Sequence, residues 1–127
     1  MTEHNTQLAI IDLIKWRGGV ATRVNSGSIT KTVGEKTYRV KLADKDTADI
    51  IGLYKGIYLA IEVKHGKNKA TPVQVEFLES VASAGGVGLV AYDIDVVEKL
   101  LDAIVVYGDK FHIYVVVEKP NQLFIGG

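Results

Sequence analysis

Two acidic residues and a lysine near the middle of the chain, Asp49, Glu62 and Lys64, have the types and spacing that could do chemistry. Each acid lies in its own short, apolar, β-branched run, and Lys55-Gly56 joins the two runs, a pattern typical of a β-hairpin. A two-residue turn pairs Asp49 with Glu62, so both carboxylates point to one face with Cβ atoms about 4.5–5.5 Å apart. A slip of one residue would separate them.

Directly opposed carboxylates repel each other, and a raised pKa, a cationic side chain or a metal ion must offset the repulsion. Lys64 lies two residues beyond Glu62, about 6–7 Å along the strand. This distance is long for a direct pair with both acids. A Mg²⁺ ion needs one or two carboxylates together with waters and phosphate oxygens. It would supply the Lewis acid and the activated water of phosphodiester hydrolysis. Lys64 would then be free to hold the attacking water or the scissile phosphate. The alternative is that these acids are ordinary strand-start and surface residues.

The apolar periodicity of the rest of the chain predicts a mixed β-sheet with helices packed on it, an α/β fold. Alternation along the central hairpin makes one face core and leaves Asp49, Glu62 and Lys64 together on the other. The expected helices are residues 3–17, 71–84 and 94–103. The expected strands are 20–24, a hairpin over 29–42, the central pair 49–53 and 57–64, then 87–92, 105–107, 111–117 and 122–125.

The 127 residues suit one domain, with 47% hydrophobic and 24% charged residues and no cysteine. This composition argues against a disordered chain and excludes disulfides, thiolate metal sites and cysteine nucleophiles. No apolar run approaches the roughly 20 residues of a membrane span, and the N-terminus is polar. We therefore expect a cytoplasmic protein with no membrane partner.

Fifteen basic and fifteen acidic residues give a formal net charge of zero, which argues against a generally basic nucleic-acid binder. The balance is uneven along the chain, however. Residues 1–70 carry 12 Lys and Arg against 7 Asp and Glu, while residues 71–127 carry 3 against 8. This asymmetry favours a polyanion that contacts one part of the surface, although chance separation of solvated charges stays an alternative.

Three segments together resemble the virus-type replication-repair nuclease (VRR-NUC) family of the PD-(D/E)XK nuclease superfamily. They are Thr47-Ala48-Asp49-Ile50-Ile51-Gly52, Tyr58-Leu59-Ala60-Ile61-Glu62-Val63-Lys64 and Thr71-Pro72-Val73-Gln74, with Arg23-Val24-Asn25-Ser26-Gly27 upstream. The similarity covers about residues 3–92. It implies one nuclease domain with a restriction-endonuclease-like mixed sheet flanked by helices. An extra β-rich tail over 95–127 stays unassigned.

The resemblance implies that Asp49, Glu62 and the backbone carbonyl of Val63 ligate Mg²⁺ or Mn²⁺. Lys64 would activate the water and stabilise charge on the phosphate. The chain departs from the family at Ala48, where proline is usual; alanine can adopt the same extended conformation.

Two further site residues follow from the resemblance, each with a structural alternative. Gln74 matches the family's additional motif residue, but Thr71-Pro72-Val73-Gln74 is also a capping box. Glu3 matches an acid on the first helix that faces the metal site in relatives, but an acid there also suits a helix N-terminus.

Basic and polar residues on both sides of this site are candidates for contact with DNA phosphates. Lys67 and Lys69 lie in the loop just after Lys64, and Arg23, Asn25 and Ser26 follow the first expected strand. Loops of such composition are otherwise simply solvated.

The expected function is a structure-selective DNA endonuclease of Holliday-junction resolvase type, in phage or prophage DNA replication or repair. The alternatives are a flap or duplex nuclease of the same chemistry and a DNA-binding module whose catalytic site has decayed. Small family members act as homodimers on branched DNA, so we also expect a homodimer. The apolar run 111–117 in the tail is a candidate interface.

Overall fold

The computed structural model describes residues 2–24, 28–41 and 47–126. Two of the expected DNA-contacting residues, Asn25 and Ser26, lie outside these ranges. Within them, no helix is both long enough and apolar enough to cross a membrane.

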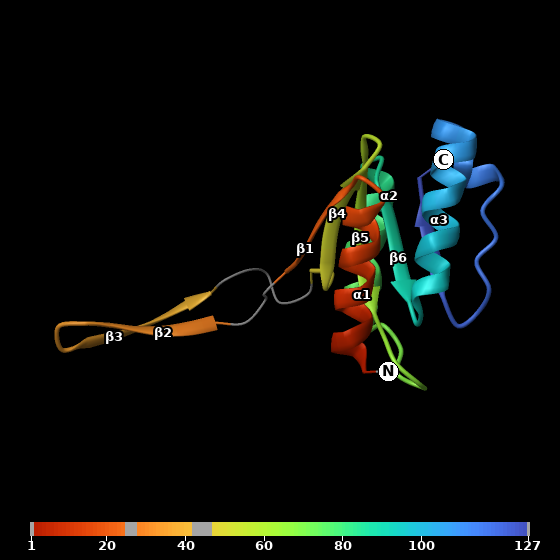
Figure 1. Ribbon diagram of the computed structural model, residues 1–127. Coiled ribbons are helices and arrows are strands. Elements are labelled where there is room, and N and C mark those ends of the chain that lie inside the picture. The colour runs from red at the N-terminus through yellow and green to blue at the C-terminus, as the bar shows by residue number, and fades with distance from the viewer. Residues whose placement is uncertain (1, 25–27, 42–46, 127) are drawn as a thin grey trace.

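Five strands of the described chain form one mixed sheet in the order β1-β4-β5-β6-β7. These are β1 (Val20–Arg23), β4 (Ile50–Tyr54), β5 (Ile57–Val63), β6 (Val87–Ala91) and β7 (Gln122–Ile125). Strands β5 and β6 are parallel and are connected by helix α2 (Pro72–Ser83), while the other neighbours are antiparallel. The expected α/β fold with a mixed sheet flanked by helices is confirmed (Figure 1).

Helices cover both faces of the sheet. On one face, α1 (Glu3–Trp16) and α3 (Ile94–Tyr107) bury side chains such as Ile14 and Leu100 against Leu59 and Ile61. On the other face, Leu78 of α2 packs against Ala60 and Val90. This second face, on which Glu62 lies, is therefore partly covered, because the hydrophobic side chains of α2 need a partner as well.

The register of the central hairpin is as expected. Tyr54 pairs with Ile57 and Ile50 with Ile61, which places Asp49 opposite Glu62 by continuation of the ladder. Lys55 and Gly56 both have positive φ, 48° and 81°. A two-residue turn of this kind matches the twist of the strands that it joins, and it sets their register.

The C-terminal tail contains one strand in the described chain, β7, at the expected position. The strands expected at 105–107 and 111–117 were wrong. Helix α3 continues to Tyr107, and a 3₁₀ helix η1 (Gly108–Ile113) follows. Burial of Leu100, Leu101 and Ile104 on one helical face prolongs α3 despite the β propensity of Val105 and Val106.

Strands β2 (Ser28–Val33) and β3 (Lys36–Lys41) form a separate two-stranded sheet at the expected hairpin. Figure 1 shows this hairpin projecting away from the body of the protein, beyond the β1 and β4 side of the sheet.

The close approach of α2 to the sheet depends on Gly88 of β6. A Cβ atom at position 88 would lie 2.7 Å from the carbonyl oxygen and 2.8 Å from the Cβ of Leu78. Both atoms belong to Leu78 of α2, so the helix would have to move to accept a side chain at position 88.

We therefore predict that Gly88→Ala destabilises the protein by about 1–3 kcal/mol, the usual cost of overpacking a dense core. Urea unfolding measures the change. Ser83→Ala, at an exposed position in the last turn of α2, is the control and should stay within about 0.5 kcal/mol of wild type. Equal stability of the two variants would contradict this packing.

Candidate active site

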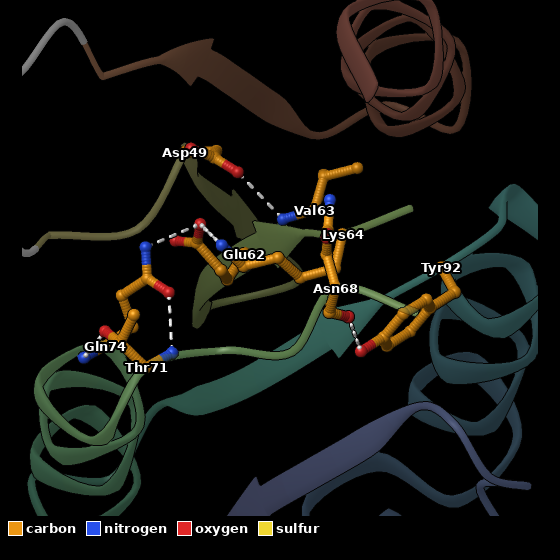
Figure 2. Close-up of polar contacts among 8 residues, drawn as sticks. All are labelled: Asp49, Glu62, Val63, Lys64, Asn68, Thr71, Gln74 and Tyr92. Atoms are coloured by element: carbon orange, nitrogen blue, oxygen red, sulfur yellow. Dashed lines mark hydrogen bonds and ion pairs between the residues drawn. The ribbon is translucent and has the colours of Figure 1, made fainter. Parts of the chain in front are cut away.

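Asp49 is held between the two strands that flank β4. Its backbone carbonyl accepts a hydrogen bond of 2.8 Å from the Val24 N–H, just after β1. Its side-chain Oδ2 accepts another of 2.8 Å from the Val63 N–H at the end of β5 (Figure 2). Backbone groups on both sides therefore fix this residue, and one of them, the Val63 N–H, fixes its carboxylate.

Glu62 is the only charged residue among those that the structure describes as buried, with 3% of its surface exposed. Its Oε1 accepts a hydrogen bond of 3.2 Å from Gln74 Nε2 and lies 3.7 Å from the ammonium of Lys64. Its Oε2 is buried with no hydrogen-bond partner. A buried carboxylate oxygen without a partner is costly, and such a group calls for an explanation such as a bound water or ion or a catalytic role.

The protonation of Glu62 reflects this environment. Burial raises the pKa of its carboxyl from 4.5 to about 8, and the nearby charge of Asp49 acts in the same direction, while Lys64 partly opposes both. Desolvation dominates because a charge removed from water loses its hydration. The carboxyl therefore carries a proton near neutral pH unless a positive charge replaces that proton.

The donors at this site can be compared with what a hard divalent cation needs. The described ranges contain no group of three or more His, Asp or Glu side chains placed to hold a metal ion, and Asp49 and Glu62 are the two carboxylates here. One or two carboxylates are what Mg²⁺ takes from a protein when waters and phosphate oxygens complete its shell. The unpartnered Glu62 Oε2 is the observation on which this fit depends.

The strand rise placed Lys64 about 6–7 Å away, too far for a direct pair with both acids. In the described chain Lys64 lies 3.7 Å from Glu62 and forms no ion pair with Asp49. The estimate followed the strand rise between Cα atoms, but the flexible four-carbon side chain extends back beside the Glu62 carboxylate (Figure 2). Its backbone N–H donates to the carbonyl of Ala91, which extends the β5–β6 pairing by one residue.

The amide of Gln74 takes part in the capping box of α2 and also contacts Glu62. Its Oε1 accepts from the Thr71 N–H at 2.9 Å, and the Thr71 hydroxyl accepts from the Gln74 N–H at 3.2 Å, which completes the capping box. Its Nε2 remains available and donates to Glu62. The helix cap thus orients the amide toward the buried carboxylate.

Arg23 lies on the strand face opposite Glu62, and Glu3 begins α1, the helix that packs on that face. Glu3 is half-buried in the first turn of α1, and no hydrogen bond or ion pair joins it to Asp49, Glu62 or Lys64 in the described chain. Arg23 is exposed and shares the strand face of the buried Ala21. Their expected roles stay predictions.

The loop after β5 presents Lys67 and Lys69 to solvent beside the site. Its shape is held by a turn in which the Asn68 N–H donates to the His65 carbonyl. The Tyr92 hydroxyl donates to the Asn68 carbonyl (Figure 2).

Tyr92 was missed by reasoning from the sequence. Parallel pairing of β5 with β6 would have pointed to it. In that register Val63 pairs with Ala91, so Tyr92, the residue after β6, comes beside Lys64.

None of the known protein-family models matches this chain, and no curated protein is significantly similar to it.

The raised pKa of Glu62 predicts that the metal-free protein loses stability as the pH rises. Because the folded-state value of about 8 exceeds the ordinary 4.5, the stabilisation is complete below about pH 4.5 and is lost as the pH passes through 8. Within this window the slope from Glu62 approaches roughly 1.4 kcal/mol per pH unit. Urea unfolding in EDTA between about pH 5 and pH 9 measures it.

Glu62→Gln is the matched variant, since it keeps the shape and the acceptor but cannot ionise. Its stability should depend less steeply on pH over the same range. An identical slope in the variant and the wild type would show that other groups carry the dependence.

Proposed function

We propose that this protein is a Mg²⁺- or Mn²⁺-dependent DNA endonuclease of the VRR-NUC type. The observation that carries the proposal is the buried, partly unpartnered Glu62 carboxylate opposite Asp49, with Lys64 and Gln74 on its other oxygen. A protein with no need of a cation would gain nothing from two facing carboxylates, because their repulsion is destabilising.

Asp49, Glu62 and the Val63 carbonyl would hold the cation, which supplies a Lewis acid for the phosphoryl oxygen and lowers the pKa of a water. The Lys64 ammonium is the group of this chain that can stabilise negative charge developing on the phosphate or orient the attacking water. Gln74 keeps the Glu62 carboxylate in position through its amide. Glu3 is proposed to approach the cation directly or through water.

The charge distribution supports DNA as the substrate. The site belongs to the half of the chain with 12 basic and 7 acidic residues. Exposed Lys67 and Lys69 lie beside the site in the loop after β5, and Arg23 is exposed at the end of β1. Cations at such positions bind the phosphate backbone and position it without reading sequence. The enzyme would act in the cytoplasm, in phage or prophage DNA replication or repair.

A structure-selective activity on four-way junctions is the form that we propose, with flaps and linear duplexes as the alternative substrates. A resolvase must make two symmetric cuts, so this form goes with a homodimer.

The C-terminal apolar patch, consisting of Val106, Tyr107, Tyr114 and Val116, is a candidate surface for that second copy. All four side chains are exposed, and the rings of Tyr107 and Tyr114 stack with centroids 4.0 Å apart. With neighbouring residues they line a hollow of about 420 Å³.

We predict cleavage of DNA that requires Mg²⁺ or Mn²⁺ and is abolished by EDTA. Lys64→Ala should reduce the rate about 100-fold or more, the usual cost of losing one group that stabilises transition-state charge. Incubation with a labelled four-way junction, a flap and a linear duplex, followed by denaturing electrophoresis, measures the rates. Symmetric nicks confined to the junction would select the resolvase.

Lys15→Ala is the matched control, because Lys15 is exposed in the last turn of α1 and lies outside both the candidate site and the C-terminal apolar patch. This variant should cleave at the wild-type rate. If the wild type cleaves none of the three substrates with either metal, the decayed DNA-binding module is the correct alternative.

We also predict that the protein is a dimer in solution and that Val106→Asp with Val116→Asp converts it to a monomer. Burying two new charges against an apolar partner surface costs more than a dimer contact supplies. Light scattering gives the mass, and Val20→Asp, an exposed change on β1, is the control. A wild type that is monomeric at micromolar concentration would refute the dimer, and a double variant that stays dimeric would exclude the patch.

A further inference from the structure

The β2–β3 hairpin is a two-stranded ribbon with both faces in solvent over residues 31–38. Its strands pair from Ser28 with Lys41 to Val33 with Lys36, and residues 31–38 are all exposed. It forms its own sheet rather than an extension of the main one. A two-stranded hairpin by itself is marginally stable in water, so a ribbon that covers no core is expected to have another use.

The charge of the ribbon is strongly positive for its size. Residues 28–41 include four basic residues, Lys31, Lys36, Arg39 and Lys41, and one acid, Glu35. The protein as a whole has no net charge, so this projecting segment concentrates positive charge away from the acidic half. Such a distribution attracts a polyanion to one side of the molecule.

The described side chains of the ribbon suit contact with nucleic acid. Lys31 opposes Tyr38 and Lys36 opposes Val33 across the strands, while Thr32 opposes Thr37 with hydroxyl oxygens 3.3 Å apart. Lysine, threonine and tyrosine side chains are all common donors to DNA phosphates.

We propose that the β2–β3 hairpin is a DNA-binding arm that lies in the major groove of the duplex next to the scissile site. This inference rests on the proposed function, since it assumes that the substrate is DNA. A six-residue strand extends for about 20 Å, and the major groove, about 12 Å wide, admits a two-stranded ribbon. The arm adds affinity and orientation, while Asp49, Glu62 and Lys64 carry out the cleavage.

Position relative to the candidate site supports this role. The arm is inserted in the chain between β1 and β4, which pair with each other, and β4 begins directly after Asp49. A duplex that contacts both the arm and the site would therefore extend away from the sheet on its β1 and β4 side, where Figure 1 shows the hairpin.

The test is the affinity for labelled duplex and four-way junction DNA, measured by fluorescence anisotropy in EDTA so that no cleavage is needed. Lys31→Gln with Lys36→Gln should weaken binding roughly tenfold and reduce the slope of log K against log salt by about 2. Lys15→Gln with Lys55→Gln removes the same charge from exposed sites at the end of α1 and in the β4–β5 turn and should leave both quantities nearly unchanged.

A second variant, in which a short Gly-Ser linker replaces residues 28–41, separates charge from shape. Because the ribbon belongs to no other sheet, the body should keep its unfolding transition, and DNA binding should fall at least as far as in the double variant. Wild-type affinity and salt slope in both hairpin variants would overturn the proposal. Conversion of a dimer to a monomer in these variants, with unchanged DNA affinity, would also overturn the proposal. The ribbon would then be a self-association arm.

These outcomes are independent of catalysis. Failure of the proposed function appears as a wild type that cleaves nothing in Mg²⁺ or Mn²⁺, whereas failure of the arm appears as unchanged binding in EDTA. A protein that cleaves DNA with no contribution from the hairpin would retain the first proposal and lose the second.

Discussion

Burial of the Glu62 carboxylate opposite Asp49 is the constraint on which the arrangement of this protein depends. Desolvation and the nearby charge of Asp49 both oppose ionisation of Glu62, so an ionised carboxylate needs compensation there. The neighbouring elements each supply part of the compensation. Strand β5 donates its Val63 N–H to Asp49, helix α2 brings the Gln74 amide, and Lys64 returns its ammonium to Glu62. One carboxylate oxygen is still left without a partner.

The fold places these compensating groups with ordinary structural devices. A positive-φ turn sets the hairpin register, and a capping box sets the direction of the Gln74 side chain. The close contact between Gly88 and Leu78 sets how near α2 lies to the sheet. Each device also stabilises the protein, so stability and site geometry are coupled. A change in the packing of α2 would reach the Glu62 carboxylate through the Gln74 amide.

Two parts of the molecule differ in what their chemistry can do. The end of β5 gathers charged groups in a largely buried place, which strengthens the electrostatic interactions among them. The β2–β3 ribbon is exposed and rich in cations, conditions in which charges act through long-range attraction and are screened by salt. Affinity and chemistry can thus be separated, since a solvated arm binds a polyanion without the desolvation cost that a buried site incurs.

The sequence by itself determined the features that depend on local rules. The hairpin around Lys55-Gly56, the capped start of α2 at Thr71 and the pairing of Asp49 with Glu62 follow from turn chemistry and alternation along neighbouring strands. Tertiary structure decided the rest. Burial of one face kept residues 105–107 helical against their β propensity, α2 covered the sheet face that carries Glu62, and parallel pairing with β6 brought Tyr92 to the loop. Only packing could show that Glu62 loses its water, because desolvation depends on every element that surrounds a side chain.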